Sequence, residues 1–345
     1  MSIDERLPFL LQKKHIAYSD TNALYILDRR LYPTYKSYFR CQTVTQIAQA
    51  LQQMVTQGGG PLQVGLETMR FIATKIHHKE KKNHLTTFIE AAHQLSQARP
   101  TNTTLLRTLF EITDKISRWY LCGEIRDSYQ DDLPTFVEEI ISSYESYFDD
   151  VYDKLSDYGS SLIQDGMSIL TTCFAEHSFS LAMAKAVEQG KSIEVFVNET
   201  RPYLQGSRLS APSLAELGVR VNVIVDGSAA ALMANNLIHL YMTAVDVVAM
   251  DGSMANKTGT LPNAIAASYY GIKYYPFAMS PDPNLLTIDH IVIEKRDGSA
   301  LTTTANVKGY YPAFDVVPPS LVSGYITKNG IVAPEAIAKQ FGEPT

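Results

Sequence analysis

The stretch Asn198-Glu-Thr-Arg-Pro-Tyr-Leu-Gln-Gly-Ser-Arg-Leu-Ser-Ala211 joins two runs of different character. Before it, residues 192–197 form an apolar run of the β type, and after it residues 212–217 are typical of a helix. A polar loop between a strand and a helix is where open α/β sheets hold their ligands. The stretch therefore predicts both an α/β sheet and a ligand-binding loop.

Three polar side chains of this loop suit an anionic ligand. They are Arg201, Gln205 and Arg208, with Gly206 among them. Arginine binds phosphate oxygens through charge-assisted, often paired, hydrogen bonds. The loop could therefore hold a phosphorylated or hydroxyl-rich ligand, although ion pairs made by its own arginines would explain the same residues.

Strand-like and helix-like runs alternate from Met167 onward. Short apolar strands separated by helices predict a mostly parallel sheet with helices on both faces and functional groups at the carboxyl ends of its strands. The chain contains neither GxGxxG nor GxxxxGK[ST], so no dinucleotide or nucleoside triphosphate is indicated. The strand-like runs are residues 168–172, 194–197, 220–225, 239–245 and 273–278.

The N-terminal segment has a different pattern. A hairpin is expected around residues 23–28 and 29–33, and an amphipathic helix within residues 127–157 leads into the second domain. The run Gly58-Gly59-Gly60-Pro61 separates two helical patterns. Its backbone N–H groups could bind an anion, but from the glycines alone a plain turn is the preferred interpretation. The helical patterns cover residues 44–57, 66–78, 85–97 and 103–122.

The composition narrows the class of protein. A chain of 345 residues, 45% hydrophobic and 19% charged, predicts a globular protein of two domains. The net charge of −6 and the short basic cluster at residues 77–82 argue against a nucleic-acid surface, and no apolar run is long enough to cross a membrane. Three distant cysteines without a CxxC pair favour a reducing, cytoplasmic setting and no disulfide or zinc framework.

Two strand ends carry groups capable of acid–base chemistry. Cys173 follows a predicted strand and precedes a helix, whose dipole would lower the pKa of the thiol. Asp246 and Asp226 end two other strands, where desolvation could raise a carboxyl pKa. A buried structural cysteine and helix-capping aspartates are the alternatives, and the capping role fits Asp226 better.

Three further polar residues could contact an anion. Asn256 and Lys257 lie in a glycine-punctuated loop and suit hydroxyls and phosphate oxygens. Arg99 immediately precedes a predicted helix, where a cation is disfavoured unless an anion is bound. No histidine pair has convincing metal-ligand spacing, so neither a metal nor a cofactor is predicted.

These motifs, in order along almost the whole chain, resemble those of the methylthioribose-1-phosphate isomerases, which are relatives of the regulatory subunits of initiation factor 2B. Residues 198–211 nearly reproduce the family's Asp-Glu-Thr-Arg-Pro-x-x-Gln-Gly-Ala-Arg-Leu-Thr-Ala, and Leu27-Asp-Arg-Arg-Leu-Tyr-Pro33 resembles its Leu-Asp-Gln-x-Leu-Leu-Pro. The other similar stretches are Ala98-Arg-Pro-Thr101, Ala255-Asn-Lys-Thr-Gly-Thr260 and Pro312-Ala-Phe-Asp-Val-Val-Pro318.

The resemblance implies a fold and an activity. The fold would be a small, mainly helical N-terminal domain with a short hairpin, residues 1–125, followed by a Rossmann-like catalytic domain, residues 126–345, usually in a homodimer. The activity would be conversion of 5-methylthioribose 1-phosphate to the ribulose 1-phosphate in methionine salvage. Cys173 and Asp246 match the catalytic pair, and the substrate-binding positions match Gln57, Gly58, Gly59, Arg99, Gln205, Asn256 and Lys257.

The chain departs from the family in three places. The family's Arg-Gly-Ala-Pro is Gln57-Gly-Gly-Gly-Pro61 here, Thr-His-Cys-Asn is Thr171-Thr-Cys-Phe174, and Gly-Ala-Asp-Arg is Ala244-Val-Asp-Val247. The valines beside Asp246 would give it a low dielectric and keep its carboxyl protonated.

Two alternatives follow from these departures. One is an isomerase of another pentose 1-phosphate, such as 5-deoxyribose 1-phosphate; the other is a non-catalytic regulatory protein that senses a sugar phosphate or nucleotide. Retention of Cys173 and Asp246 favours an enzyme, because the regulatory relatives characteristically lack that pair.

Overall fold

The chain folds as two units, Met1–Pro8 with Val151–Thr345 and Phe9–Asp150. The computed structural model describes residues 2–77, 83–100, 102–291, 293 and 295–342. Most of the basic cluster at residues 77–82 and the last residue of the Ala98–Thr101 motif lie outside the described residues.

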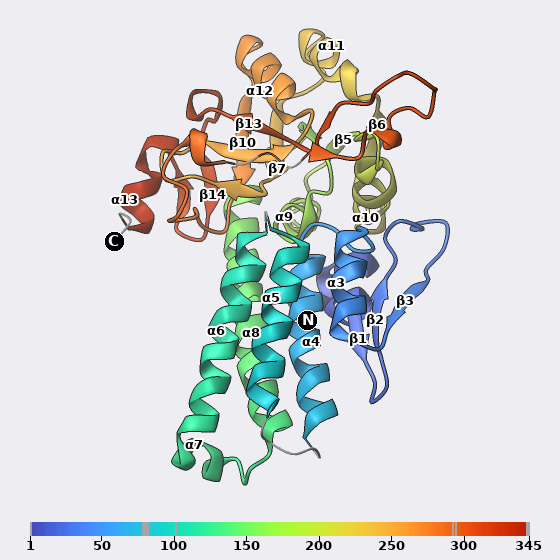
Figure 1. The fold of residues 1–345 in the computed structure, drawn as a ribbon. Helices are drawn as coiled ribbons and strands as arrows, with labels where there is room; N and C mark the ends of the chain where they lie inside the picture. The colour runs from blue at the N-terminus through green and yellow to red at the C-terminus, as the bar shows by residue number, and fades with distance from the viewer. Residues whose placement is uncertain (1, 78–82, 101, 292, 294, 343–345) are drawn as a thin grey trace. The chain divides into compact units, whose positions relative to one another are not determined.

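A seven-stranded sheet forms the centre of the first unit (Figure 1). Neighbouring strands are parallel, except for the antiparallel pair at one edge, so the predicted mostly parallel α/β sheet is confirmed. All five predicted strands belong to it, whereas the two strands nearest the C-terminus were missed because three residues are too few to show a period. In spatial order the strands are β15 (Gly330–Val332), β14 (Tyr325–Thr327), β10 (Lys273–Phe277), β7 (Leu240–Ala244), β4 (Ser168–Thr171), β5 (Glu194–Asn198) and β6 (Arg220–Ile224).

Helices cover both faces of this sheet, as the parallel pairing requires (Figure 1). One face packs in a single apolar cluster with the C-terminal turns of α8 (Leu133–Ser161), α9 (Glu176–Glu188) and α10 (Ala211–Glu216). The opposite face packs with α11 (Ala229–Ala234), α12 (Thr260–Tyr269) and α13 (Ile337–Phe341). The central strands β4 and β7 read as nearly continuous apolar runs because both of their faces are buried, whereas the edge strand β6 is largely exposed.

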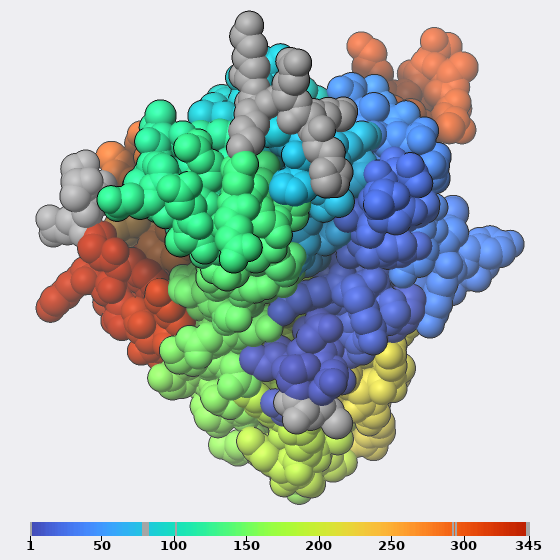
Figure 2. Space-filling view, turned by 90° about the horizontal axis from the view of Figure 1, so that it is seen from below, coloured from blue at the N-terminus to red at the C-terminus, as the bar shows by residue number. Residues whose placement is uncertain are grey.

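Smaller elements complete the sheet unit. An antiparallel sheet of order β13-β9-β8 consists of β13 (Phe314–Val317), β9 (Met254–Lys257) and β8 (Val247–Val248). The largely exposed segment 301–308 projects from the surface at the upper right of Figure 2 and carries none of the predicted site residues. The remaining short elements are α1 (Ile3–Arg6), β11 (Lys295–Arg296) and β12 (Tyr311–Pro312).

The unit Phe9–Asp150 is built mainly of helices around one apolar core. It also holds an antiparallel sheet of β1 (Ala17–Ser19), β2 (Leu24–Leu27) and β3 (Tyr38–Cys41), in that order. Its helices are α2 (Lys13–Ile16), α3 (Val44–Gln52), α4 (Gly60–Ile76), α5 (His84–Ala98), α6 (Thr103–Leu121), α7 (Gly123–Ser128) and the first part of α8.

The predicted hairpin is wrong in its second strand. Residues 29–33 form a turn, and β2 pairs with β1 and β3 instead. The turn forms because the carboxylate of Asp28 accepts the backbone N–H of Arg30 at 3.0 Å, while the Asp28 carbonyl accepts that of Leu31 at 3.1 Å. Aspartate favours such local bonds over strand pairing.

An ion-pair cluster joins α4 to α8 within the helical unit. Arg70 contacts Glu67 at 3.3 Å, Glu138 at 2.7 Å and Glu145 at 2.9 Å. Burial by itself would raise the pKa of Glu145, but hydrogen bonds from Arg70 and Gln63 outweigh it and lower that pKa. Glu145 therefore stabilises the folded state only while it is ionised, whereas burial raises the pKa of Glu67 in the same cluster.

Candidate active site

The strand order reverses direction at the centre of the large sheet. From β4 the chain adds β5 and β6 on one side, then returns to place β7 directly beside β4 on the other. Such a switch point leaves a crevice at the carboxyl ends of the two central strands. Cys173 lies two residues beyond β4, and Asp246 lies two residues beyond β7. The topology thus brings together two residues that are far apart in the sequence.

Local hydrogen bonds fix the backbone of Cys173. Its φ of +67° lies in the left-handed region, which is uncommon for a residue other than glycine. Its N–H donates to Oγ1 of Thr200 at 3.0 Å, and its carbonyl accepts the hydroxyl of Ser210 at 2.6 Å. Both partners come from the loop that follows β5, so this loop holds the half-buried thiol in place.

Burial dominates the ionisation of this thiol. Desolvation raises the pKa of Cys173 from 9.0 to about 11; the charge of Lys257 lowers it and that of Asp246 raises it. The predicted thiolate is therefore wrong, because α9 begins only at Glu176 and its dipole does not offset the loss of water. These two Coulomb interactions also indicate that the thiol, the ammonium and the carboxyl share one electrostatic environment.

Asp246 occupies a more open position than predicted. Its backbone N–H donates to the carbonyl of Ala255 in β9 at 3.1 Å, but the residue is exposed, while Val245 and Val247 are half-buried. The expected low-dielectric setting is therefore absent from this structure. An exposed carboxyl needs some further covering group before its pKa can rise by desolvation.

Lys257 and Asn256 end β9 in buried positions, 5% and 4% exposed. Nζ of Lys257 lies 4.7 Å from the centre of the Phe314 ring, and among the described residues the ammonium has no ion-pair partner. Asn256 donates from Nδ2 to Oγ1 of Thr260 at 3.1 Å. A buried cation without a carboxylate beside it is costly unless an anion arrives, so Lys257 is well suited to an anionic ligand.

The three predicted ligand residues of the loop after β5 differ in their exposure to solvent. Gln205 is 2% exposed, and its Oε1 has no hydrogen-bond partner in the described structure. Arg208 is half-buried and donates to the carbonyl of Tyr203 at 3.4 Å, whereas Arg201 is exposed. The loop is held by Asp226, whose carboxylate accepts the backbone N–H groups of Thr200 and Arg201, both at 2.8 Å. The predicted helix-capping role of Asp226 is therefore wrong: its carboxylate binds the loop after β5, and the N-cap residue of α11 is Ser228.

The other predicted residues belong to the helical unit. Gln57 is 5% exposed with an unpartnered Oε1, Gly58 has φ of +62°, and Gly59 is the N-cap residue of α4. Arg99 is buried at the end of α5, and its Nη1 donates to Sδ of Met54 at 3.3 Å. The predicted site residues thus form two groups, one in each unit.

The family model of the initiation factor 2 subunits matches residues 60–334. The chain belongs to the initiation factor 2 subunit family. It is 31% identical to a methylthioribose-1-phosphate isomerase of Citrobacter koseri, over 92% of this chain and 94% of that protein. The resemblance to the methylthioribose-1-phosphate isomerases that the motifs indicated is confirmed.

Solved structures of an isomerase and of an initiation factor subunit share the fold of this chain. The 5-methylthioribose 1-phosphate isomerase of Pyrococcus horikoshii superposes with a TM-score of 0.78 at 25% identity, covering 99% of each chain. The delta subunit of initiation factor eIF-2B from A. fulgidus gives 0.73, also at 25% identity, over 93% of this chain and 96% of that one. The fold by itself therefore does not separate enzyme from regulatory subunit, and the site residues must do so.

A buried polar network beside Cys173 escaped the sequence analysis. Asn263 in α12 donates from Nδ2 to Oδ1 of Asn198 at 2.9 Å and to Oγ1 of Thr172 at 3.2 Å. Thr172 also bonds Asn198, at 3.1 Å, and the Tyr241 hydroxyl, at 2.9 Å. Because each of these residues comes from a different element, only the sheet topology joins them into one support for the thiol's strand end.

A second residue that was missed is Asp315. Its carboxylate accepts the N–H groups of Gly259 at 2.8 Å and Leu261 at 3.0 Å, so it caps the first turn of α12 from β13. Its place in the Pro-Ala-Phe-Asp motif was the available signal.

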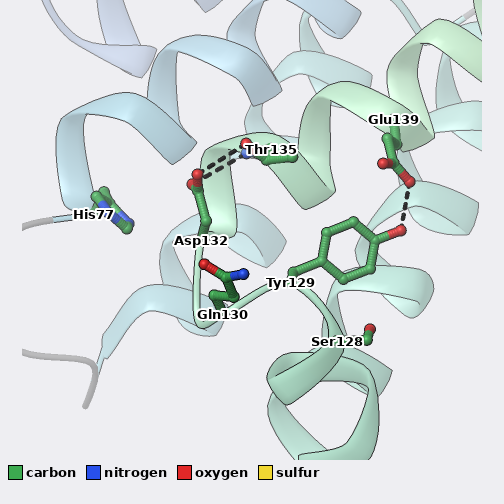
Figure 3. A pocket seen from close by; sticks show the side chains of 7 residues that line it. All are labelled: His77, Ser128, Tyr129, Gln130, Asp132, Thr135 and Glu139. Atoms are coloured by element: carbon green, nitrogen blue, oxygen red, sulfur yellow. Dashed lines mark hydrogen bonds between the residues drawn. The ribbon is translucent and has the colours of Figure 1, made fainter.

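The helical unit contains a polar cavity of about 720 Å³ (Figure 3). Tyr129, Asp132 and Glu139 contribute to its lining, and none of the predicted site residues does. Within the described residues, no three His, Cys, Asp or Glu side chains are grouped so that they could hold a metal ion. None of the helices in the described part of the chain has the length and apolar character needed to cross a membrane.

Proposed function

We propose that this chain is an aldose–ketose isomerase that converts 5-methylthioribose 1-phosphate to the corresponding ribulose 1-phosphate in methionine salvage. The similarity to named isomerases over more than nine-tenths of the chain supports this reaction. The observation that carries it is the placement of Cys173 and Asp246 at neighbouring strand ends of the switch point. Lys257, buried and without an ion-pair partner among the described residues, supports a phosphorylated substrate.

The proposed reaction begins with opening of the sugar ring. The protonated carboxyl of Asp246 gives its proton to the ring oxygen as the bond between that oxygen and C1 breaks. Hydrogen then moves from C2 to C1, and the C2 hydroxyl returns a proton to the Asp246 carboxylate as the ketone forms. The exposed carboxyl would gain the required raised pKa when the bound sugar covers it and removes water.

Cys173 would assist the movement of hydrogen between C2 and C1. With its pKa raised to about 11, it is a neutral thiol at neutral pH. It can therefore donate a hydrogen bond beside the reacting carbons while hydrogen moves from C2 to C1 with its electron pair, whereas removing the C2 proton would require the thiol to ionise first. No cofactor takes part in this proposal.

The predicted substrate contacts are proposed for each unit by itself. In the sheet unit these are Arg201, Gln205, Arg208, Asn256 and Lys257. In the helical unit they are Gln57, Gly58, Gly59 and Arg99. Backbone N–H groups at the start of α4 suit phosphate oxygens, as do the buried arginine and lysine.

Turnover of 5-methylthioribose 1-phosphate by the purified protein tests the function. We expect ketose formation, with a loss of about a hundredfold or more in Cys173→Ser and in Asp246→Asn. Cys122→Ser and Asp289→Asn serve as matched controls, because neither residue lies at the switch point. Undiminished turnover in either site variant would remove that residue from the mechanism. A folded protein that binds the sugar phosphate without converting it would support a regulatory role instead.

A panel of sugar 1-phosphates tests the substrate. We expect 5-methylthioribose 1-phosphate to give a higher kcat/KM than 5-deoxyribose 1-phosphate. The reverse order would assign the chain to a different pentose phosphate while leaving the chemistry unchanged.

We further infer a cytoplasmic homodimer with a Rossmann-like catalytic domain; the domain boundary near residue 125 remains a prediction. The reversal of strand order supports the Rossmann-like assignment. Exposed apolar side chains on and around α11 and α12 support a dimer: Leu237, Ile265 and Tyr269, the last 81% exposed. Light scattering on the wild type should give twice the chain mass, and Tyr269→Lys should shift it toward the monomer.

A further inference from the structure

Two hydroxyl side chains bind both backbone polar groups of Cys173. Oγ1 of Thr200 accepts its N–H at 3.0 Å, and the hydroxyl of Ser210 donates to its carbonyl at 2.6 Å. Thr200 is 1% exposed and Ser210 is 3% exposed, so water competes little for either bond. Thr200 and Ser210 together form a hydroxyl clamp on Cys173.

Each hydroxyl of the clamp makes a second bond that completes its pairing. Thr200 donates to the carbonyl of Asn198, the last residue of β5, at 3.0 Å. Ser210 accepts the N–H of Ala175, the N-cap residue of α9, at 3.2 Å. Each hydroxyl therefore donates once and accepts once, which uses its single hydrogen. Valine or alanine in these places can do neither, so substitution removes the clamp without changing any charge.

Backbone strain at both ends of one of these bonds indicates a functional arrangement. Cys173 has φ of +67° and Thr200 has φ of +65°. The left-handed region is unfavourable for residues with a Cβ atom, and most of all for a β-branched residue such as threonine. Strain of this kind persists where surrounding bonds hold it, and it is concentrated at active sites. The clamp supplies such a bond, because it joins the two strained residues directly.

The clamp residues stand at the two ends of the loop that is predicted to bind the ligand. Thr200 immediately precedes Arg201, and Ser210 ends a π-helical turn that begins at Gly206. π-Helical turns are rare and are often found at functional sites. The loop thus begins and ends with a bond to Cys173, and its shape determines where the thiol lies.

We propose that Thr200 and Ser210 are positioning residues that hold the thiol of Cys173 for the reaction from the two ends of the loop after β5. The catalytic role of Cys173 rests on the proposed function, whereas the clamp itself does not. Neither hydroxyl needs to touch the substrate, because each acts by fixing the backbone that carries the thiol. A misplacement of about 1 Å can cost on the order of a hundredfold in rate, so loss of the clamp should lower kcat more than it raises KM.

Steady-state kinetics test the clamp in turnover. Thr200→Val and Ser210→Ala remove the hydroxyls, and we expect each to lower kcat by about tenfold or more while KM changes less than about threefold. Thr200→Ser keeps the hydroxyl and should stay within about threefold of wild type in both constants. Ser207→Ala is the matched control, because the Ser207 hydroxyl donates to the Leu204 carbonyl at 3.2 Å within the same loop.

Alkylation of Cys173 tests the clamp without any substrate. Burial raises the pKa of this thiol to about 11, so release of its backbone and entry of water should lower that pKa. We expect Thr200→Val and Ser210→Ala to speed iodoacetamide labelling of Cys173 at pH 8 by about tenfold, which corresponds to a pKa lower by about one. Thr200→Ser and Ser207→Ala should leave the pH profile at its wild-type position.

Three outcomes would overturn the proposal. They are an unchanged labelling profile in folded Thr200→Val and Ser210→Ala, equal losses of kcat in Thr200→Ser and Thr200→Val, and a double variant whose loss equals the product of the single losses, since residues that act on one group are not additive. If one variant does not fold, the other decides, because each removes one end of the same clamp. Absence of turnover in the wild type would refute the proposed function alone, and the labelling profiles would still decide the clamp.

Discussion

The ionisation of Cys173 gives the sharpest test of the switch-point geometry. Burial raises its pKa from 9.0 to about 11, so at pH 8 the thiolate fraction falls from about one tenth to about one thousandth. Alkylating reagents attack the thiolate, so the reaction at Cys173 should be about a hundredfold slower than at an ordinary thiol. Its rate should keep rising with pH beyond 9 toward 11, where the rate of an ordinary thiol has already levelled off.

Two variants separate the charges that act on this thiol. The carboxylate of Asp246 raises the pKa of Cys173, so Asp246→Asn should lower that pKa and speed alkylation at a given pH. The ammonium of Lys257 lowers the same pKa, so Lys257→Met should raise it and slow the reaction. The two substitutions must therefore shift the pH profile in opposite directions.

Iodoacetamide labelling resolved by peptide mass spectrometry measures all three cysteines in one protein, without further mutation. The position of the profile on the pH axis reports ionisation, whereas limited access would lower the rate equally at every pH. A profile for Cys173 that levels off near pH 9 would refute the dominance of burial. Shifts of equal sign in the two variants would refute the shared electrostatic environment. Thermal unfolding of wild type and Cys173→Ala adds a check: since the folded pKa of Cys173 lies above the unfolded one, its contribution to stability should fall by about 3 kcal/mol as pH rises from 9 to 11. Cys41, whose pKa burial also raises to about 11, should add a similar loss to both proteins.

Three further predictions concern the supports of the site and of the helical unit. Gly206→Ala would place a Cβ atom 1.7 Å from the backbone oxygen of Asn198, so we expect a loss of about 3 kcal/mol or more in denaturant unfolding, whereas Gly227→Ala, with no atom within 4 Å, should be nearly neutral. Asn263→Ala removes the two hydrogen bonds that the amide donates to the buried oxygens of Asn198 and Thr172, which keep their bond to each other, and should cost about 2 kcal/mol. Exposed Asn235→Ala should cost less than half of that. Arg70→Met should cost about 3 kcal/mol at neutral pH, and the difference from wild type should narrow as pH falls through the lowered pKa of Glu145, because protonation removes the stabilised carboxylate. Arg118→Met, which breaks only an exposed pair with Asp114, should change the stability by less than about 1 kcal/mol at any pH.

Much of the fold was predictable because its signals are local. The alternation of apolar runs and helical patterns located five strands of the large sheet, and the central strands β4 and β7, buried on both faces, read as nearly continuous apolar segments. The helical pattern of residues 66–78 located most of α4, but its first turn was missed because Gly60 and Pro61 were interpreted as a separator, although proline fits the first turn of a helix. Residues 29–33 were misassigned because the Asp28 turn depends on one side-chain bond that periodicity does not report.

The site was only partly predictable, because its energetics depend on burial. Cys173 and Asp246 could be located at strand ends, but a helix dipole was expected to govern the thiol and apolar neighbours to cover the carboxyl. Instead, burial raises the pKa of the thiol, and the carboxyl is exposed to solvent. Solvent exposure depends on packing between elements that are distant in the sequence. The roles of Asn263 and Asp315 were likewise hidden, since each acts on an element far away in the chain.

The amino-acid sequence by itself determined the class of sheet, the loop after β5 and the identity of the chemical groups. Each of these features could be predicted from a short, continuous stretch of residues. The tertiary structure alone decided that β7 lies next to β4, that the thiol stays protonated and that Thr200 and Ser210 bind the backbone of Cys173. The physical reason is that hydrogen bonding along a strand or helix is set by near neighbours, whereas desolvation and charge interactions are set by whichever distant residues the fold brings within a few ångströms.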